Sequence, residues 1–197
     1  MKLIFITGPS GSGKTTISKY ISQYLTNSYI LSTDNYYKTG LVSKISSKII
    51  KSYFDKNFSH DQGLIRRDID NIIKNNSINH YYKYDFIKKV TKKHLKKFSN
   101  IQNLIVEGIF SLELTDFFSE NQYLLIRLKE KKCLCRKRIL QRDIIERGKN
   151  NFFNLNEFNN AWNIYKNKEK KYRSKIIRGI TLRKDFDMDV LLKKLSK

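Results

Sequence analysis

The chain has few of the residues that cross-link or interrupt a fold. Its 197 residues include one proline, Pro9, and two cysteines, Cys133 and Cys135. The cysteines lie two apart in a basic segment typical of a helix, where residues at this spacing point to different faces. Neither a disulfide nor a metal pair is therefore expected, and a reducing cytoplasm is the expected location. No Pro/Gly/Ser-rich linker divides the sequence, which predicts a single domain over 1–197.

Long apolar runs and acidic residues are also scarce. No run approaches the roughly 20 apolar residues of a membrane helix, and the apolar N-terminus is too short for a signal peptide. Only 18 Asp and Glu oppose 40 Lys and Arg, which gives a formal net charge of +22. This excess suits a nucleic-acid binder or an enzyme for polyanionic substrates. Its even spread favours a lysine-rich surface instead. In 86–98, lysine pairs recur every four residues between apolar positions at 87, 90, 95 and 98, which predicts a helix with one solvated and one buried face.

Five short runs are uniformly apolar rather than alternating, which predicts strands buried on both faces of a parallel sheet. They are 3–7, 28–32, 103–108, 123–128 and 175–180. Amphipathic stretches at 14–26 and 129–147 predict helices between them. This alternation predicts an α/β fold of three layers. Residues 34–100 show no clear buried strand, and such excursions after a strand's carboxyl end are where α/β proteins place substrate sites.

The stretch GPSGSGKT, residues 8–15, satisfies the P-loop pattern G-x-x-x-x-G-K-[ST] between a predicted strand and a predicted helix. Its glycines allow backbone N–H groups to face phosphate oxygens, and the helix N-terminus adds the positive end of its dipole. Lys14 would reach the β- and γ-phosphates, and the Thr15 hydroxyl would bind Mg²⁺. The predicted nucleotide-binding residues are Gly8, Pro9, Ser10, Gly11, Ser12, Gly13, Lys14, Thr15 and Thr16.

Two acids follow predicted strands and suit roles beside the phosphates. Glu107, at the tip of strand 103–108, is the candidate for a second Mg²⁺ contact, directly or through water. Asp34 follows strand 28–32, across the cleft from the γ-phosphate, where a carboxylate can take the proton of an acceptor hydroxyl. The alternative for Asp34 is an ordinary turn or N-cap aspartate.

Arginines gather in the stretch RKRILQRDIIERGK, residues 136–149. On a helix, Arg138 and Arg142 share a face, and Arg147 follows just over a turn later. Arginines brought over the phosphates by a mobile lid, residues 136–150, would neutralise charge in the transition state. A basic surface helix is the alternative, but the interleaved acids can fix the arginines in place, which favours a kinase.

An ordered series of motifs makes the chain resemble the uridine kinase family of P-loop nucleoside kinases, which is related to phosphoribulokinase. The series is GPSGSGKTT, STDNYYK, YDF, VEGIF and RDIIERGK, and the resemblance spans roughly residues 3–180. It implies a five-stranded parallel sheet and an ATP or GTP donor with Mg²⁺. It also implies transfer of the γ-phosphoryl group to the 5′-hydroxyl of uridine or cytidine, a step of pyrimidine salvage. Relatives form homo-oligomers, so a homo-oligomer is a further expectation.

The resemblance also implies roles for single residues. The residues so matched are the catalytic base Asp34, its aromatic companion Tyr37, the pyrimidine-holding Tyr84 and Phe86, the lid and acceptor-site arginines Arg142 and Arg147, and the EG-motif acid Glu107. Lys14 keeps its place in the phosphate cradle.

Two departures from the family pattern fall in the acceptor region. The family's YDFxxH supplies a histidine to the base, whereas this chain has Lys89 there, and lysine only donates hydrogen bonds and keeps its charge. The family's DHPDA stretch is reduced to SHDQG, which leaves His60 and Asp61 as candidates for ribose contact. The missing histidine keeps another small hydroxyl acceptor open. The net charge keeps a nucleotide-dependent nucleic-acid binder open as an alternative of a different class.

Overall fold

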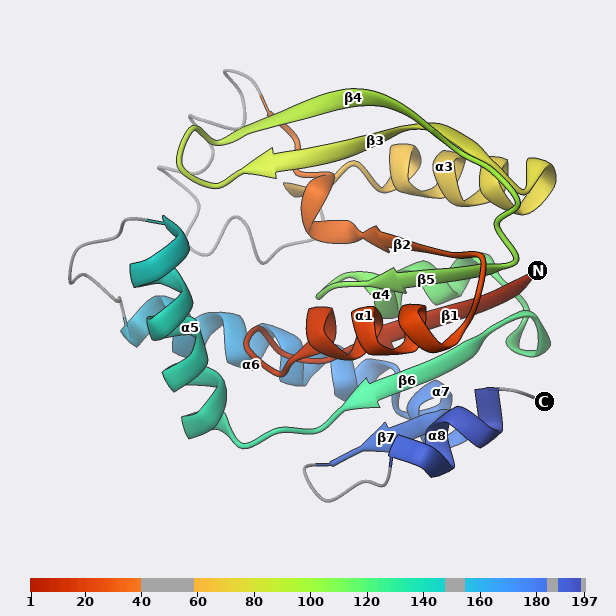
Figure 1. Ribbon diagram of the computed structural model, residues 1–197. Coiled ribbons are helices and arrows are strands. Elements are labelled where there is room, and N and C mark those ends of the chain that lie inside the picture. The colour runs from red at the N-terminus through yellow and green to blue at the C-terminus, as the bar shows by residue number, and fades with distance from the viewer. Residues whose placement is uncertain (40–58, 148–154, 184–187, 196–197) are drawn as a thin grey trace.

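The computed structural model describes residues 1–39, 59–147, 155–183 and 188–195. Its central sheet has five parallel strands in the order β2-β5-β1-β6-β7 (Figure 1). The strands are β1 (Lys2–Thr7), β2 (Ser28–Ser32), β5 (Asn103–Glu107), β6 (Leu124–Leu128) and β7 (Ile180–Leu182). The predicted five-stranded parallel sheet is confirmed.

Helices cover both faces of this sheet, which confirms the predicted three-layer α/β architecture (Figure 1). On one face lie α1 (Lys14–Tyr24) and α8 (Met188–Leu195). On the other lie α3 (Gln62–Asn75), α4 (Ser111–Leu114), α6 (Leu155–Lys171) and α7 (Arg173–Arg178). Helix α5 (Lys132–Arg147) stands beyond the carboxyl ends of the strands.

Alternate residues of β1 pack into the two helical layers, which explains why the strand is apolar throughout. Ile4 and Ile6 belong to a buried cluster with Ile21 of α1 and the leucines of α8. Leu3 and Phe5 belong to a second cluster with the isoleucines of α3. Each such side chain contributes about 1.5–3 kcal/mol when fully buried. The sheet is therefore held from both sides, and its carboxyl edge is a rigid platform.

The last strand lies later in the chain than predicted. Residues 175–180 were expected to form it, but α7 occupies 173–178 and β7 begins at Ile180. The apolar pair in this stretch explains the error, because Ile176 is buried whereas Ile177 is 70% exposed. One buried side and one exposed side fit a helix at the surface better than a strand buried on both faces.

The prediction of a helix over 86–98 was wrong. That stretch contains the turn and second strand of an antiparallel hairpin, β3 (Ile78–Asp85) and β4 (Val90–Phe98), which lies beside β2 (Figure 1). Leu95, expected to be buried, is 85% exposed. Lysine pairs every four residues suit a helix face. In this chain, however, residues 90–98 pair with β3, and these cross-strand contacts favour a strand.

The two cysteines lie in different surroundings. Cys133 is exposed and Cys135 is buried, so the two thiols point to different faces as predicted. Burial raises the pKa of the Cys135 thiol to about 11, which keeps it protonated and unreactive. Within the described ranges, every helix is too short or too polar to span a bilayer.

Candidate active site

The phosphate-binding loop connects β1 to α1, as predicted. Gly13 caps α1 with a left-handed φ of 93°, and, apart from its chain neighbours and the helix backbone, a Cβ built there would meet no atom of the described residues within 4 Å. The remaining residues of the loop and of the first helical turn are Gly8, Pro9, Ser10, Gly11, Ser12, Thr15 and Thr16. Open space thus lies in front of the helix N-terminus, where backbone N–H groups and the helix dipole favour an anion.

Lys14 is folded back over this loop and is almost completely buried. Its Nζ donates hydrogen bonds to the carbonyl oxygens of Gly8 (3.0 Å) and Pro9 (3.1 Å). Burial lowers the pKa of the Lys14 ammonium, whereas the charges of Asp34 and Glu107 oppose that shift. Phosphate oxygens could take over from the two carbonyls with a stronger, charge-assisted bond. The geometry fits the predicted role of Lys14 at the phosphates.

Glu107 and Thr15 lie together, as the predicted Mg²⁺ site requires. In the parallel sheet Glu107 pairs in register with Ile6 of β1 and with Ser32 of β2. Its buried carboxylate accepts hydrogen bonds from the Ser32 and Thr15 hydroxyls. Burial raises the pKa of Glu107, and the nearby charge of Asp34 raises it further. A cation here would relieve both effects.

Asp34 lies in a short 3₁₀ turn, Thr33–Asn35, directly after β2. Gly108 allows this turn to approach the tip of β5, because a Cβ at Gly108 would lie 1.8 Å from Thr33 Oγ1. Asp34 Oδ1 is buried and has no hydrogen-bond partner among the described residues. The Asp34 charge also acts on both Lys14 and Glu107. An acceptor hydroxyl would satisfy this orphaned carboxylate oxygen.

These oxygen atoms fit Mg²⁺ together with the phosphates of a nucleotide. Mg²⁺ usually takes one or two protein oxygens and completes its octahedron with phosphates and water. Thr15 and Glu107 supply such a pair. The part of the chain that the structure describes has no group of three or more His, Cys, Asp or Glu that could hold a metal alone. The residues therefore suit a metal that arrives with its nucleotide.

Helix α5 carries the predicted arginines toward the phosphate loop. Arg138 Nη1 donates to the Gly11 carbonyl (3.2 Å) and pairs with Glu130 (3.0 Å), so it ties the helix to the loop. Arg142 pairs with Asp143 (3.2 Å), one of the interleaved acids, and its charge adds to the lowering of the Lys14 pKa. Arg147 ends α5, and its side chain lies outside the described residues, as do residues 148–150 of the predicted lid.

A column of packed aromatic rings, tilted or edge-on to one another, borders the Asp34 turn. Tyr37 and Phe110 flank the His60 ring, each with a centroid distance of 3.9 Å. On the hairpin side, Tyr84 packs on Tyr37 (4.7 Å) and Phe86 packs on Tyr84 (4.9 Å). Three of these residues, Tyr37, Tyr84 and Phe86, are ones to which the family resemblance assigned roles, and the fold brings their rings together.

The far end of this column was not predicted from the sequence. Phe110 follows the EG motif, and the Lys168 ammonium of α6 lies 3.9 Å from the centroid of its ring. Lys168 also pairs with Glu113 (2.5 Å), which neutralises much of its charge. No local signal links Phe110 to Lys168, because 57 intervening residues separate them and only the fold brings them together.

The rings of Tyr37, His60, Tyr84, Phe86 and Phe110 together form an aromatic wall. His60 contributes a neutral polar group to it. Its Nδ1 lies 2.8 Å from Ser59 Oγ, and its Nε2 is buried without a hydrogen-bond partner among the described residues. Burial, with Lys168 and Lys38 nearby, lowers the pKa of His60 to about 2. The imidazole can therefore exchange hydrogen bonds with an uncharged group but carries no charge at neutral pH.

Backbone contacts fix the wall beside the proposed base. The Tyr84 N–H donates to Asn35 Oδ1 (3.2 Å), and Thr91 Oγ1 donates to the Tyr37 carbonyl (2.7 Å). These bonds join the hairpin to the turn that carries Asp34. An acceptor held against the wall would lie next to Asp34.

Other candidates for acceptor recognition have different surroundings. Asp61 caps α3, because its Oδ1 accepts a hydrogen bond from the Leu64 N–H (2.9 Å). Lys89 lies in the hairpin turn with a left-handed φ of 53°. His80 pairs with Asp68 (3.3 Å), and His94 stacks on Tyr81 on the hairpin. His60 is therefore the histidine that the fold places beside the Asp34 turn.

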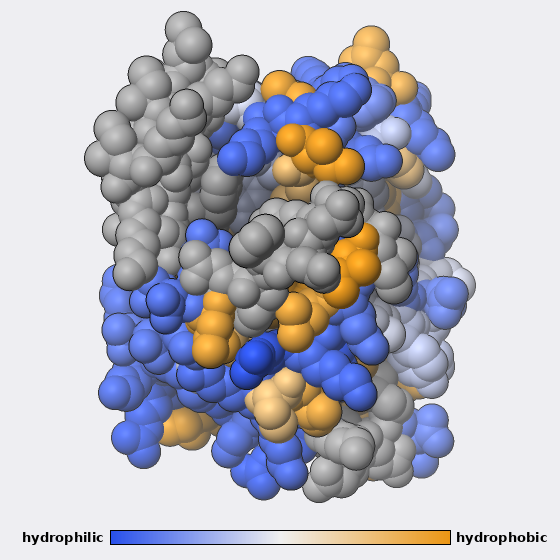
Figure 2. Space-filling model, turned by 90° about the vertical axis from the view of Figure 1, so that its left-hand side faces the viewer, coloured by the Kyte–Doolittle hydropathy of each residue, from blue (hydrophilic) through white to orange (hydrophobic). Residues whose placement is uncertain are grey.

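The end of the molecule that carries this site mixes hydrophobic side chains with a largely hydrophilic surround (Figure 2). Exposed apolar side chains at this end include Phe86 and Ile87 at the hairpin turn and Ile144 on α5. Apolar groups on both the hairpin and α5 suit a site that closes on a partly apolar molecule.

Solved structures with the same fold are kinases by title. One is titled a possible uridine kinase from Bacillus stearothermophilus, with a TM-score of 0.58 and 17% identity, and covers 92% of this chain and 88% of its own. Another is D-glycerate 3-kinase from Cryptococcus neoformans, with a TM-score of 0.57 and 14% identity, covering 89% and 80%. These likenesses show that the fold is that of the P-loop kinases.

A family model described as an AAA domain matches residues 4–158, so the chain belongs to this AAA domain family. Among curated proteins, a uridine kinase from Borrelia duttonii is 36% identical over 109 residues, which cover 55% of this chain and 52% of the relative. The resemblance to uridine kinases is confirmed over that part. The chain spans about half the length of the curated relatives it matches.

Proposed function

We propose that the chain is an ATP- or GTP-dependent kinase that phosphorylates the 5′-hydroxyl of a pyrimidine nucleoside, uridine or cytidine, in pyrimidine salvage. The observation that carries this proposal is the meeting of three groups at one sheet edge. Lys14 of the phosphate loop, Glu107 with Thr15, and Asp34 with its orphaned oxygen influence one another electrostatically. The relatives named uridine kinase support the same acceptor class.

The arrangement suits transfer to an alcohol. The oxygen of the acceptor hydroxyl would bond to the γ-phosphorus while Asp34 accepts the hydroxyl proton. The bond between the γ-phosphorus and the β–γ bridging oxygen would break, and the nucleoside diphosphate would leave. Lys14 and the loop N–H groups would hold the donor phosphates. Arg142 and Arg147, which belong both to α5 and to the proposed lid over 136–150, would stabilise charge on the transferring group.

Thr15 and Glu107 would hold Mg²⁺, which when bound neutralises charge on the donor phosphates. Because Glu107 is buried and hydrogen-bonded to Ser32 and Thr15, its carboxylate is fixed in orientation before the metal arrives. Preorganised ligands of this kind lower the reorganisation needed during transfer.

The acceptor would lie against the aromatic wall. Phe86, which is 37% exposed and packs on Tyr37 and Tyr84, would offer a ring to a flat base, and His60 Nε2 would offer one uncharged hydrogen-bonding atom. On this basis we propose that His60 replaces the histidine that the family pattern has at the position of Lys89. Asp61 remains a proposed ribose contact through the oxygen that does not cap α3.

A different small hydroxyl acceptor is the second candidate. Lys89 at the hairpin turn is the specific observation that favours it, because a lysine would attract an acceptor with an acidic group. A kinase for such an acceptor would use the same Asp34 and Lys14.

A coupled kinase assay with Mg·ATP separates these candidates. The panel contains uridine, cytidine, 5′-deoxyuridine and D-glycerate at physiological salt. We expect turnover with uridine or cytidine and none with 5′-deoxyuridine, which lacks only the proposed acceptor hydroxyl. Turnover of D-glycerate without either nucleoside would retain the P-loop kinase and reject the pyrimidine acceptor.

A further inference from the structure

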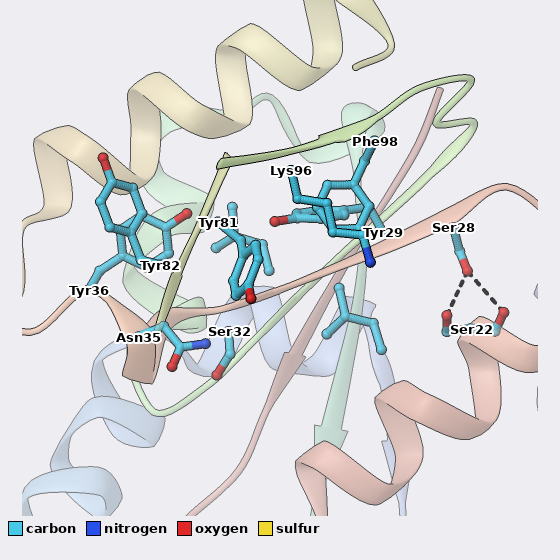
Figure 3. Close-up of a pocket in the computed structure, with 12 residues that line it drawn as sticks. Ser22, Ser28, Tyr29, Ser32, Asn35, Tyr36, Tyr81, Tyr82, Lys96 and Phe98 are labelled. Carbon is cyan, nitrogen blue, oxygen red and sulfur yellow. Dashed lines mark hydrogen bonds between the residues drawn. The ribbon is translucent and has the colours of Figure 1, made fainter. Parts of the chain in front are cut away.

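A second pocket lies outside the phosphate loop, between the hairpin and β2. It encloses about 360 Å³ between the hairpin, β2 and the end of α1 (Figure 3). This volume is within the range of about 300–1,000 Å³ that small-molecule sites occupy. None of the nucleotide or metal residues named above lines it, although Ser32, which bonds to Glu107, stands at one end.

Aromatic side chains form the hairpin side of this pocket. The ring of Tyr81 stacks on His94 at 4.9 Å with an interplanar angle of 12°, and Phe98 approaches its edge at 6.3 Å. Tyr29 of β2 packs edge-on against Phe98 at 5.0 Å. These contacts hold the rings in place, so a flat ligand could stack on them with little loss of side-chain entropy.

Lys96 adds a positive charge whose counter-ion is absent among the described residues. Its Nζ lies 5.2 Å from the centroid of the Phe98 ring, and no ion pair of the described residues includes it. In Figure 3 the Lys96 side chain reaches past Tyr29 toward β2. An anionic group in the pocket would supply the missing partner.

A pair of serines forms the polar end of the pocket. Ser28 Oγ donates to the Ser22 carbonyl (2.9 Å) and lies 2.7 Å from Ser22 Oγ (Figure 3). Because these protons are used within the pair, the oxygens retain lone pairs for donors from a ligand, such as sugar hydroxyls. Rings, a cation and hydroxyl oxygens together match the base, phosphate and sugar of a nucleotide.

We propose that this pocket binds a free nucleoside monophosphate, with its base on Tyr81 and its phosphate at Lys96. The site is separate from the phosphate loop and does not depend on the proposed kinase activity. Ser32 lines the pocket and bonds to Glu107, so it is a side chain that the pocket shares with the proposed metal pair.

Photo-crosslinking with 4-thiouridine 5′-monophosphate tests this proposal on the full chain. Trypsin separates the peptide 75–83, which contains Tyr81, from 84–88, which contains Tyr84 of the aromatic wall. We expect a saturable crosslink on 75–83 that excess uridine 5′-monophosphate removes. Tyr81→Ala should weaken binding about tenfold or more, the loss expected for one stacked base.

Lys96→Met and Lys97→Met form a matched pair, because Lys97 is the neighbouring lysine and does not line the pocket. Lys96→Met should raise the concentration needed for half-saturation of the 75–83 crosslink about tenfold, as expected for the loss of a charged hydrogen bond. Lys97→Met should leave it unchanged. Unfolding midpoints of both variants show whether the fold is kept.

Three outcomes would overturn the site. The first is crosslinking confined to 84–88, and the second is equal saturation in the two lysine variants. The third is competition by an oligouridylate but not by the mononucleotide, which would assign the pocket to a nucleic-acid strand. Kinase turnover of uridine is measured on the same samples, so failure of this proposal is distinguishable from failure of the proposed function.

Discussion

The phosphate loop and the aromatic wall lie at the same sheet edge but are built in different ways. The loop is one continuous stretch that would contact phosphates mainly through backbone N–H groups and the buried Lys14, whose Nζ donates to the Gly8 and Pro9 carbonyls. The wall takes single rings from separate segments of the chain, among them Tyr37, His60 and Phe110. Recognition of an acceptor by this wall would therefore depend on side chains and on the fold that brings them together.

Lys14→Ala should have the largest effect on transfer. We expect kcat with Mg·ATP and uridine to fall about 10³-fold, because a preorganised charge at the transferring phosphate is lost. Lys19→Ala, on the exposed side of α1, is the matched control and should keep normal turnover. Near-normal kcat in Lys14→Ala would place the donor phosphates elsewhere.

Asp34→Asn should impair phosphoryl transfer without impairing nucleotide binding at the phosphate loop. The change keeps the shape of the side chain but removes the base, so we expect kcat to fall about 10²-fold or more. Affinity for ATP, measured by calorimetry, should stay within a few-fold of normal because the loop is untouched. If kcat is unchanged, Asp34 is only a turn residue.

His60→Leu should affect the acceptor alone. Loss of one uncharged hydrogen bond should raise the KM for uridine about tenfold, and His60→Gln should recover part of it. Because the pKa of His60 is lowered to about 2, its contribution to KM should be flat between pH 5 and 8. A transition near pH 6.5 in wild type that His60→Leu abolishes would contradict the neutral role.

Lys89→Asn is the comparison for His60, because asparagine tolerates the left-handed backbone at this turn. If His60 replaces the family histidine, the KM for uridine should change less in Lys89→Asn than in His60→Leu. The reverse order would assign base recognition to the hairpin turn.

Glu107→Gln should give the smallest effect, on stability in the absence of metal. Burial raises the pKa of Glu107 above its ordinary value of 4.5, so the folded state holds a proton that the unfolded state releases. The free energy of unfolding should therefore fall as pH rises from about 4.5 through the raised pKa. Urea unfolding across this window should show a shallower fall in Glu107→Gln than in wild type.

The sequence was sufficient for the loop and for the acids beside it. A P-loop motif is local, and the tips of parallel strands share one edge, so Glu107 and Asp34 could be placed from their strands alone. The same reasoning identified the other strands of the central sheet but misplaced β7. The apolar run 175–180 was predicted to be that strand, but most of it lies in α7, at the surface.

The acceptor side was harder because its structure depends on contacts between distant segments. Residues 86–98 have a helical spacing of lysines, yet 86–89 form the hairpin turn and pairing with β3 makes 90–98 a strand. His60 lies 50 residues before Phe110, and no local pattern shows that their rings pack against each other. The role of His60 in the wall could only be read once the fold had brought these rings together.

The most direct test of the proposed transfer is ³¹P NMR of wild-type chain incubated with Mg·ATP and uridine. A kinase with the acceptor held beside Asp34 predicts a new resonance of a nucleoside 5′-monophosphate that grows as ATP is converted to ADP. Release of inorganic phosphate without that resonance would show an ATPase and contradict the assignment of the acceptor site.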